Sequence, residues 1–213
     1  MTNKLLNIIG EEFPLTPISV GGFSKIKASG LTFSVEAYSA EGLGHVSVMR
    51  AKGFFGLMKM DTLIINPTER DLPLYSYDRI FAMGNDTLIV ELYDTLLGNF
   101  SGETLKKVKD EFAALPERDP GEHWYDNIKL CESISKKGKK ITPEMDALAE
   151  KHFKAYLSAE CGAVSDKAAK QEKASVYVEG LLSKGGPSTD AFIKAIGKEK
   201  TAELFRSYLF KTV

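Results

Sequence analysis

Apolar and polar residues alternate along the middle of the chain, from residue 23 to residue 97. A period of two is typical of β-strands whose two faces meet different surroundings. Turn-forming residues such as Gly42 and Pro67 separate the alternating stretches after only a few positions. Such tight connections predict an antiparallel sheet, because parallel strands need crossovers of a dozen residues or more. The alternating stretches are residues 31–37, 46–49, 57–65, 74–81 and 87–93.

A helical pattern precedes and follows this region. Thr142, Pro143 and Glu144 are typical of a helix start, with a capping residue, a proline suited to the first turn and an acid near the positive end of the helix dipole. Strands followed by helices predict an α+β fold. We expect a single domain over residues 1–213, in which an antiparallel sheet (23–97) is flanked by helices (101–213) as an α/β/α sandwich. The predicted helices are 2–12, 101–114, 142–159, 164–184, 188–196 and 198–209, with an irregular stretch at 120–141.

Composition narrows the possible functions. The 213 residues are 43% hydrophobic and 27% charged, which are ordinary values for a folded globular protein. A formal charge of −1 argues against a dedicated nucleic-acid binder, although residues 151–213 carry 11 basic and 7 acidic side chains. The chain has neither a signal-peptide pattern nor an apolar run approaching the roughly 20 residues that span a bilayer. We therefore expect a cytoplasmic protein without membrane or nucleic-acid partners, and by default a monomer.

The familiar motifs of nucleotide, metal and nucleophile chemistry are missing. The sequence has no phosphate-binding glycine loop and no nucleophile elbow, and its two cysteines, Cys131 and Cys161, make no disulfide framework. His45, His123 and His152 lack the spacing of metal ligands to one another or to a cysteine. We interpret these histidines as surface residues and expect no metal site.

A basic run stands out within the irregular stretch. Lys136, Lys137, Lys139 and Lys140 surround a single glycine. One interpretation is a solvated loop, and the other is a docking site for an acidic protein.

Two acids inside the predicted strands are better candidates for chemistry. Alternation places Asp78 on a strand face with Leu74, Ser76 and Ile80, whereas Tyr75, Tyr77, Arg79 and Phe81 share the other face. A carboxyl group among apolar side chains loses hydration, which raises its pKa and suits a proton donor. The alternative is an edge-strand charge that prevents aggregation. Asp61 in the preceding strand raises the same question, and the residue pattern leaves both interpretations open.

In the segment 66–78, Pro67 ends a strand, Asp71-Leu72-Pro73-Leu74 follows, and Asp78 lies in the next strand. This segment resembles the corresponding part of the ferredoxin-dependent bilin reductases. The residues 191–210, with Gly197 at a break between two helices, are similar to the closing helices of that family. His123-Trp124 and Ser133 stand where the family has a tryptophan and a serine-rich crossing. The resemblance covers about residues 30–210, and it extends to the red chlorophyll catabolite reductases, which act on another open-chain tetrapyrrole.

The resemblance implies a fold, a reaction and a set of site residues. The fold is an antiparallel sheet between helices, and a linear tetrapyrrole such as biliverdin binds between the sheet and the C-terminal helices. No cofactor is bound, since reduced ferredoxin supplies electrons singly and protein acids supply protons. Asp78 matches the central catalytic aspartate, and Asp61 lies where one branch of the family has a catalytic histidine. Two further acids of the family are replaced, by Met49 and by Gly186 before Pro187, with Asp190 about one turn away.

Both the substrate and the electron donor carry negative charge, so each implies basic side chains on the protein that bind it. The propionates of a bilin need cations, for which the candidates are Arg50, Lys59, Arg79 and Arg206, and Asp190 is a further substrate-binding candidate. We expect the pocket to measure roughly 300–1,000 Å³, with Asp78 and Asp61 on the same side of the sheet. Ferredoxin is acidic, so the lysines 136, 137, 139 and 140 are candidates for docking it. The alternatives are a tetrapyrrole-binding protein without catalysis on the same scaffold, and a purely structural domain.

Overall fold

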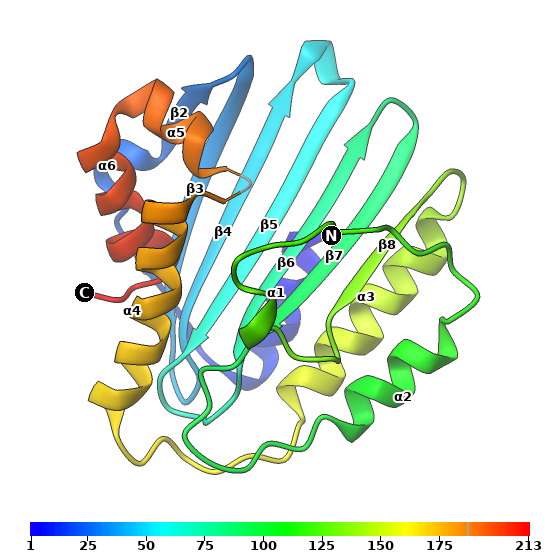
Figure 1. Cartoon of the computed structure of the whole chain (residues 1–213), viewed down its shortest axis with the longest axis vertical. Helices are drawn as coiled ribbons and strands as arrows, with labels where there is room; N and C mark the ends of the chain where they lie inside the picture. Colours follow the sequence, from blue (N-terminus) through cyan, green and yellow to red (C-terminus); the bar gives the residue numbers. More distant parts are fainter. Residues whose placement is uncertain (187) are drawn as a thin grey trace.

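The structure is a computed structural model that describes residues 1–186 and 188–213. Within these residues, eight strands form one antiparallel sheet in the order β1-β3-β4-β5-β6-β7-β8, and β2 pairs with the other part of β3 (Figure 1). From β3 to β7 each strand pairs with the next along the chain, so the centre of the sheet is a meander. The strands are β1 (Leu15–Ile18), β2 (Lys25–Ala28), β3 (Leu31–Ala40), β4 (Gly44–Gly53), β5 (Met58–Pro67), β6 (Leu74–Ala82), β7 (Asn85–Tyr93) and β8 (Ile134–Gly138).

Helices cover both faces of the sheet (Figure 1). One face packs against α1, α2 and α3, and the other packs against α4, α5 and the C-terminal turns. The helices are α1 (Thr2–Glu12), α2 (Glu103–Glu111), α3 (Thr142–Leu157), α4 (Lys167–Lys184), α5 (Thr189–Ile196) and α6 (Lys198–Glu203). Four shorter turns are η1 (Gly21–Phe23), η2 (Phe54–Gly56), η3 (Asp126–Ile128) and η4 (Leu204–Leu209), of which η4 is a π-helix.

Alternation along the strands separates the core into two apolar clusters that share the sheet. Val48, Leu63 and Tyr77 point toward α1 and α3, whereas Met49 and Ile64 point toward the C-terminal helices. Successive side chains of a strand face opposite ways, so each strand contributes to both clusters. The α+β sandwich expected from the sequence is therefore confirmed.

The structure corrects some details of the expected elements. The sheet begins earlier than residue 23, with β1, and it includes β8 from the stretch 120–141 that was expected to be irregular. Both are short edge or near-edge strands with little alternation, which leaves a weak signal. The helix expected at 198–209 changes to π geometry at Leu204, a local widening that is frequent at functional sites.

The C-terminal π-turn is fastened to the middle of the sheet by three side chains. His45 Nε2 lies 2.8 Å from the carbonyl oxygen of Tyr208. Ser47 donates a hydrogen bond of 2.7 Å to the carbonyl of Leu209, and Asn66 donates one of 2.7 Å to the carbonyl of Phe210. Burial lowers the pKa of His45 to about 4, so its ring is neutral and donates from Nε2. His152 is buried as well, so the interpretation of these two histidines as surface residues is wrong. Nε2 of each ring lies within hydrogen-bond distance of a backbone carbonyl instead, of Tyr208 for His45 and of Glu132 for His152.

No helix in the described part of the chain is both long enough and apolar enough to cross a bilayer.

Candidate functional site

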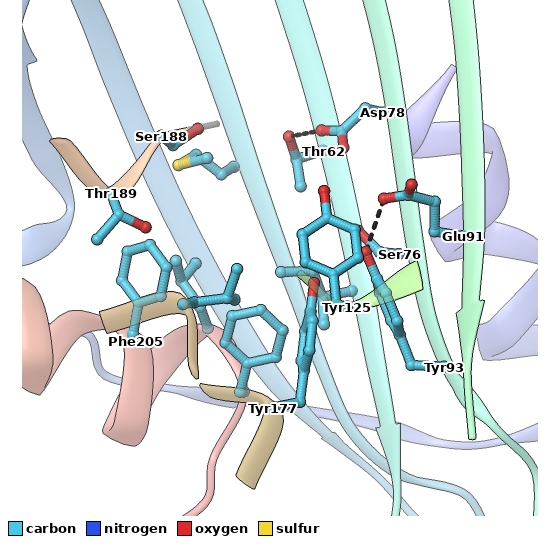
Figure 2. A pocket seen from close by; sticks show the side chains of 15 residues that line it. Thr62, Ser76, Asp78, Glu91, Tyr93, Tyr125, Tyr177, Ser188, Thr189 and Phe205 are labelled. Atoms are coloured by element: carbon cyan, nitrogen blue, oxygen red, sulfur yellow. Dashed lines mark hydrogen bonds between the residues drawn. The ribbon is translucent and has the colours of Figure 1, made fainter. Parts of the chain in front are cut away.

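A small cavity lies between the sheet and the C-terminal helices, where the sequence predicts a ligand pocket (Figure 2). Strands β4 to β7 form its floor, α4 and the π-turn form one wall, and the segment before β8 contributes Tyr125. Its volume is about 80 Å³. The lining residues are Met49, Thr62, Ile64, Ser76, Asp78, Glu91, Tyr93, Tyr125, Tyr177, Leu181, Ser188, Thr189, Phe205, Leu209 and Phe210.

Asp78 is the acid at the centre of this floor. It lies directly opposite Thr62 in the register of β5 and β6, and the Thr62 hydroxyl donates a hydrogen bond of 2.5 Å to its carboxylate. Burial raises the pKa of Asp78 to about 6, and the nearby negative charge of Glu91 acts in the same direction. The hydrogen bond from Thr62 opposes this shift but does not cancel it. At pH 7 about a tenth of this carboxyl is therefore protonated, far more than for an ordinary aspartate, and this form can donate a proton into the cavity.

Glu91 on the neighbouring strand is a second acid in the cavity, which the sequence reasoning missed. It lies on the same sheet face as Asp78, and the hydroxyl of Tyr93 donates a hydrogen bond of 2.6 Å to its carboxylate. The signal was present in the alternation of β7, but only the register of β6 and β7 places the two acids together. Figure 2 shows both side chains reaching into the same space.

Tyrosine rings form the polar wall of the cavity. Tyr93 and Tyr177 lie with ring centroids 4.1 Å apart, and Tyr125 meets Tyr93 edge to face at 5.5 Å. Burial raises the pKa of all three phenols, so they remain protonated and can donate hydrogen bonds. Flat aromatic faces with phenolic hydroxyls suit a planar conjugated ligand that carries polar edges.

Trp124 attaches the segment of the cavity residue Tyr125 to the end of α4. The indole of Trp124 donates a hydrogen bond of 3.0 Å to the carbonyl of Gly185 at the end of α4. Its ring also lies against Gly180, where an added Cβ would come within 2.1 Å of it. Glycine at position 180 is therefore what lets the tryptophan approach the helix.

The expected pocket size is wrong. A cavity of about 80 Å³ is well below the roughly 300–1,000 Å³ of typical small-molecule sites. Tyr125, Tyr177 and Phe205 fill the space between sheet and helices (Figure 2). A ligand as large as a tetrapyrrole fits only after some of these side chains move.

Asp61 is on the other side of the sheet from Asp78, contrary to expectation. It pairs with Arg79 in the β5–β6 register, whereas Asp78 pairs with Thr62. Side chains at successive positions of a strand point to opposite faces of the sheet. The pair of Asp61 and Arg79 therefore lies on one face, and the adjacent pair of Thr62 and Asp78 lies on the other. Asp61 borders a separate hollow near the start of α1, where the hydroxyl of Thr2 donates a 3.4 Å hydrogen bond to it.

Three of the expected substrate-binding cations lie on this opposite face as well. Arg50 and Lys59 border the same hollow as Asp61, and Arg50 forms a 2.6 Å ion pair with Glu36. Arg79 is fully buried and forms a 2.6 Å ion pair with Asp86. These three residues cannot reach a ligand that lies beside Asp78.

The other two candidates lie near the C-terminal helices but outside the cavity. Asp190 is exposed near the start of α5, and Arg206 forms a 2.6 Å ion pair with Glu179 of α4. Of the two positions where the family has further acids, Met49 lines the cavity. Gly186 lies in the connection between α4 and α5 and is not among the residues that line the cavity. The adjacent Pro187 is outside the described residues.

The basic run is divided between the interior and the surface. Lys136 is buried and forms a 2.5 Å ion pair with Glu117, so its inclusion in a docking surface is wrong. Alternation along β8 explains the difference, because Lys137 points to the opposite face. Lys137, Lys139 and Lys140 are exposed.

A second hollow rich in cations adjoins the cavity at Glu91. It measures about 280 Å³ and lies under the segment that leads into β8. Glu91 borders both spaces, and its carboxylate is 3.9 Å from the ammonium of Lys129. The cations of this hollow are Lys109, Arg118, Lys129 and Lys136. Within the described residues, the lining of the first cavity includes neither lysine nor arginine.

The molecule thus belongs to the class of open antiparallel sheets with helices on both faces and an acid-bearing cavity under the C-terminal helices. Neither a protein-family model nor a curated protein matches the sequence. Among solved structures, the chain is similar to phytochromobilin synthase from tomato, whose crystal structure is a complex with biliverdin. The TM-score is 0.74 at 14% identity, and the match covers 100% of this chain and 84% of that one. The fold implied by the resemblance to the bilin reductases is therefore confirmed.

Proposed function

We propose that this protein reduces a linear tetrapyrrole such as biliverdin, with electrons from reduced ferredoxin and a proton from Asp78. The observation that carries the proposal is Asp78 itself. Its pKa of about 6 results mainly from burial, and its carboxyl faces the small cavity between the sheet and the C-terminal helices. The likeness in fold to a protein crystallised with biliverdin supports the choice of ligand.

The reaction that this geometry favours adds two electrons and two protons to one double bond. Ferredoxin supplies the electrons one at a time, so a bilin radical forms first and is more basic than its parent. The carboxyl of Asp78 then protonates the radical and is left as a carboxylate, which solvent reprotonates. Thr62 holds this carboxyl in place through its hydrogen bond. A second electron from ferredoxin then reduces the protonated radical, and a second proton completes the reduction of the double bond. In this proposal Glu91 supplies that second proton, in place of Asp61, because Glu91 shares the cavity with Asp78 and Asp61 does not.

The propionates of the tetrapyrrole require cations that the first cavity does not provide. We place them in the hollow beyond Glu91, where Arg118 and Lys129 border the space. Arginine can hold a carboxylate through two parallel hydrogen bonds, and lysine adds a point charge. The pyrrole rings then lie against Tyr93, Tyr125 and Tyr177, whose side chains must open to admit them.

In this proposal the electron donor, ferredoxin, docks on the outside of the protein. An acidic ferredoxin is attracted to a basic rim, and Lys137, Lys139 and Lys140 are exposed beside the strand that ends the sheet. Reversal of these three charges should lower the rate with ferredoxin, more strongly at low salt. The rate with a small chemical reductant should stay unchanged.

Two spectroscopic steps test the function. Biliverdin mixed with the purified protein should show a sharpened, red-shifted visible band if it binds. Addition of reduced ferredoxin should then shift or bleach the band as a double bond is reduced, and chromatography of the extracted pigment identifies the product. Binding without turnover, with any low-potential donor, would contradict the reductase.

A tetrapyrrole-binding protein without catalysis is the second candidate. Met49 favours it, because this cavity residue stands where the resemblance implies a further acid and a thioether donates no proton. The same experiment separates the two functions, since the binding protein gives the red-shifted band but no reduced product.

A further inference from the structure

Four large apolar side chains project into solvent from two neighbouring hairpin tips. Phe55 is fully exposed at the β4–β5 tip, and Phe54 and Leu57 beside it are more than half exposed. Met83, at the β6–β7 tip, is 90% exposed. Met58 pairs with Ala82, so the two tips lie side by side at one end of the sheet, the upper end in Figure 1. We call this group of Phe54, Phe55, Leu57 and Met83 the apolar tip.

The backbone at the apolar tip is unfavourable for the residues that occupy it. Phe54, Phe55 and Met83 have φ angles of 50°, 55° and 51°, in the left-handed region. This region favours glycine and asparagine, and it costs other residues free energy. Neither burial nor backbone preference therefore explains large apolar side chains here, and exposed strain of this kind points to a function.

Exposed lysines lie a short distance behind the apolar tip. Lys52 and Lys59 face each other across β4 and β5, and Lys27 lies two strands further on in the same row. Lys52 is two residues before Phe54, and Lys59 is two residues after Leu57. At about 3.3 Å per residue, the lysines are set back from the tip by roughly 7 Å.

We propose that this end of the sheet binds the surface of a bilayer that contains anionic lipids. A bilayer offers a layer of negative headgroups with hydrocarbon beneath, and apolar side chains of interfacial proteins reach about 5–10 Å into that boundary. The lysines then lie at the headgroups while the phenylalanines enter the acyl region. A protein partner would need pockets for side chains that stand clear of the surface on convex tips, so the layered chemistry of lipid matches better.

Vesicle sedimentation tests the proposal with the full chain. The protein should sediment with vesicles of phosphatidylcholine containing about one third phosphatidylserine, and it should not sediment with pure phosphatidylcholine. Phe54→Asn combined with Phe55→Gly removes the apolar side chains, and both new residues favour a positive φ, so this variant should fold. Its binding should fall at least tenfold. Lys52→Glu with Lys59→Glu should lower binding by a similar factor.

Matched controls sit on other surfaces. Val176→Ser removes an exposed apolar side chain from α4, and Lys106→Glu with Lys107→Glu reverses two exposed charges on α2. Both control variants should bind anionic vesicles as the unmodified protein does. Failure of the unmodified protein to sediment with anionic vesicles would overturn the proposal, as would equal binding by the tip variant. A dimer in light scattering that the tip variant dissociates, without vesicle binding, would assign the apolar tip to a second copy of the chain.

Discussion

Thr62 and Asp78 face each other across β5 and β6, joined by a hydrogen bond of 2.5 Å from the hydroxyl to the carboxylate. The bond fixes the carboxyl in a cavity where burial has already raised its pKa to about 6. A group prepared in this way is oriented and partly protonated before any ligand arrives.

Substitution of Asp78 should separate electron transfer from proton transfer. Asp78→Asn keeps the shape of the side chain and an acceptor for Thr62, so biliverdin binding should change little. Turnover should fall by roughly 10²–10⁴-fold, the usual contribution of a positioned general acid. The bilin radical should then accumulate and give an electron paramagnetic resonance signal during slow reduction. Asp61→Asn is the control, and because Asp61 lies on the opposite sheet face its turnover should equal that of the unmodified protein. Unchanged turnover in Asp78→Asn would refute the assignment.

The same substitution should stabilise the fold in a pH-dependent way. Asp78 has a folded pKa of about 6 against an ordinary value of 3.8, so the folded protein binds more protons than the unfolded chain between these values. Its ionisation therefore costs stability as pH rises from about 4 to 6 and above. Asp78→Asn should gain about 2–3 kcal/mol in urea denaturation at pH 7.5, and the gain should disappear near pH 4. A constant difference between the two proteins at every pH would show that the carboxyl is not perturbed.

Trp124 should report ligand binding directly. It is the single tryptophan of the chain, and its ring lies edge to face against the cavity residue Tyr125, with centroids 5.2 Å apart. Biliverdin in the cavity should quench its fluorescence by energy transfer and displacement, with a saturable dependence on concentration. Free N-acetyltryptophanamide at equal absorbance corrects for light absorbed by the pigment. Quenching no greater than in this control would place the ligand elsewhere.

The buried ion pair of Lys170 and Asp71 should contribute strongly to folding. Lys170 is 1% exposed, and its ammonium lies 2.9 Å from the Asp71 carboxylate and 2.6 Å from the carbonyl of Leu72. Lys170→Met leaves the carboxylate buried without its cation and should cost about 3–5 kcal/mol in urea denaturation. The exposed Lys167 starts the same helix, and Lys167→Met should change stability by less than about 0.5 kcal/mol. Equal effects of the two substitutions would contradict this role.

Replacement of Met83 should raise stability while it weakens membrane binding. Met83 and Gly84 connect β6 to β7 and both have positive φ, the requirement of a type I′ turn. Met83→Asn creates the preferred Asn-Gly pair and should gain about 1 kcal/mol. Thermal denaturation should show a higher midpoint, and sedimentation with anionic vesicles should show weaker binding. A lower midpoint would mean that Met83 makes stabilising contacts.

The sequence by itself determined the main layers of this protein. A period of two in residues 31–93 predicted the central meander, because that alternation is what a sheet between two apolar layers requires. It also placed Asp78 apart from Tyr77 and Arg79, since neighbours in a strand point to opposite faces. Alternation within one strand does not depend on which other strands it pairs with, so it can be predicted from the sequence alone.

The tertiary structure decided everything that depends on register and on what covers each face. Asp61 and Asp78 were expected together, but the pairing of β5 with β6 shifts Asp61 by one residue to the other side. Glu91 joined the cavity through the register of β7, and Lys136 became buried because β8 formed at the edge of the sheet. Local sequence patterns could not predict the positions of these three side chains, because each position is fixed by contacts between residues far apart in the chain. A single step in register exchanges the buried and the opposite face, so small differences in pairing determine which acids share a site.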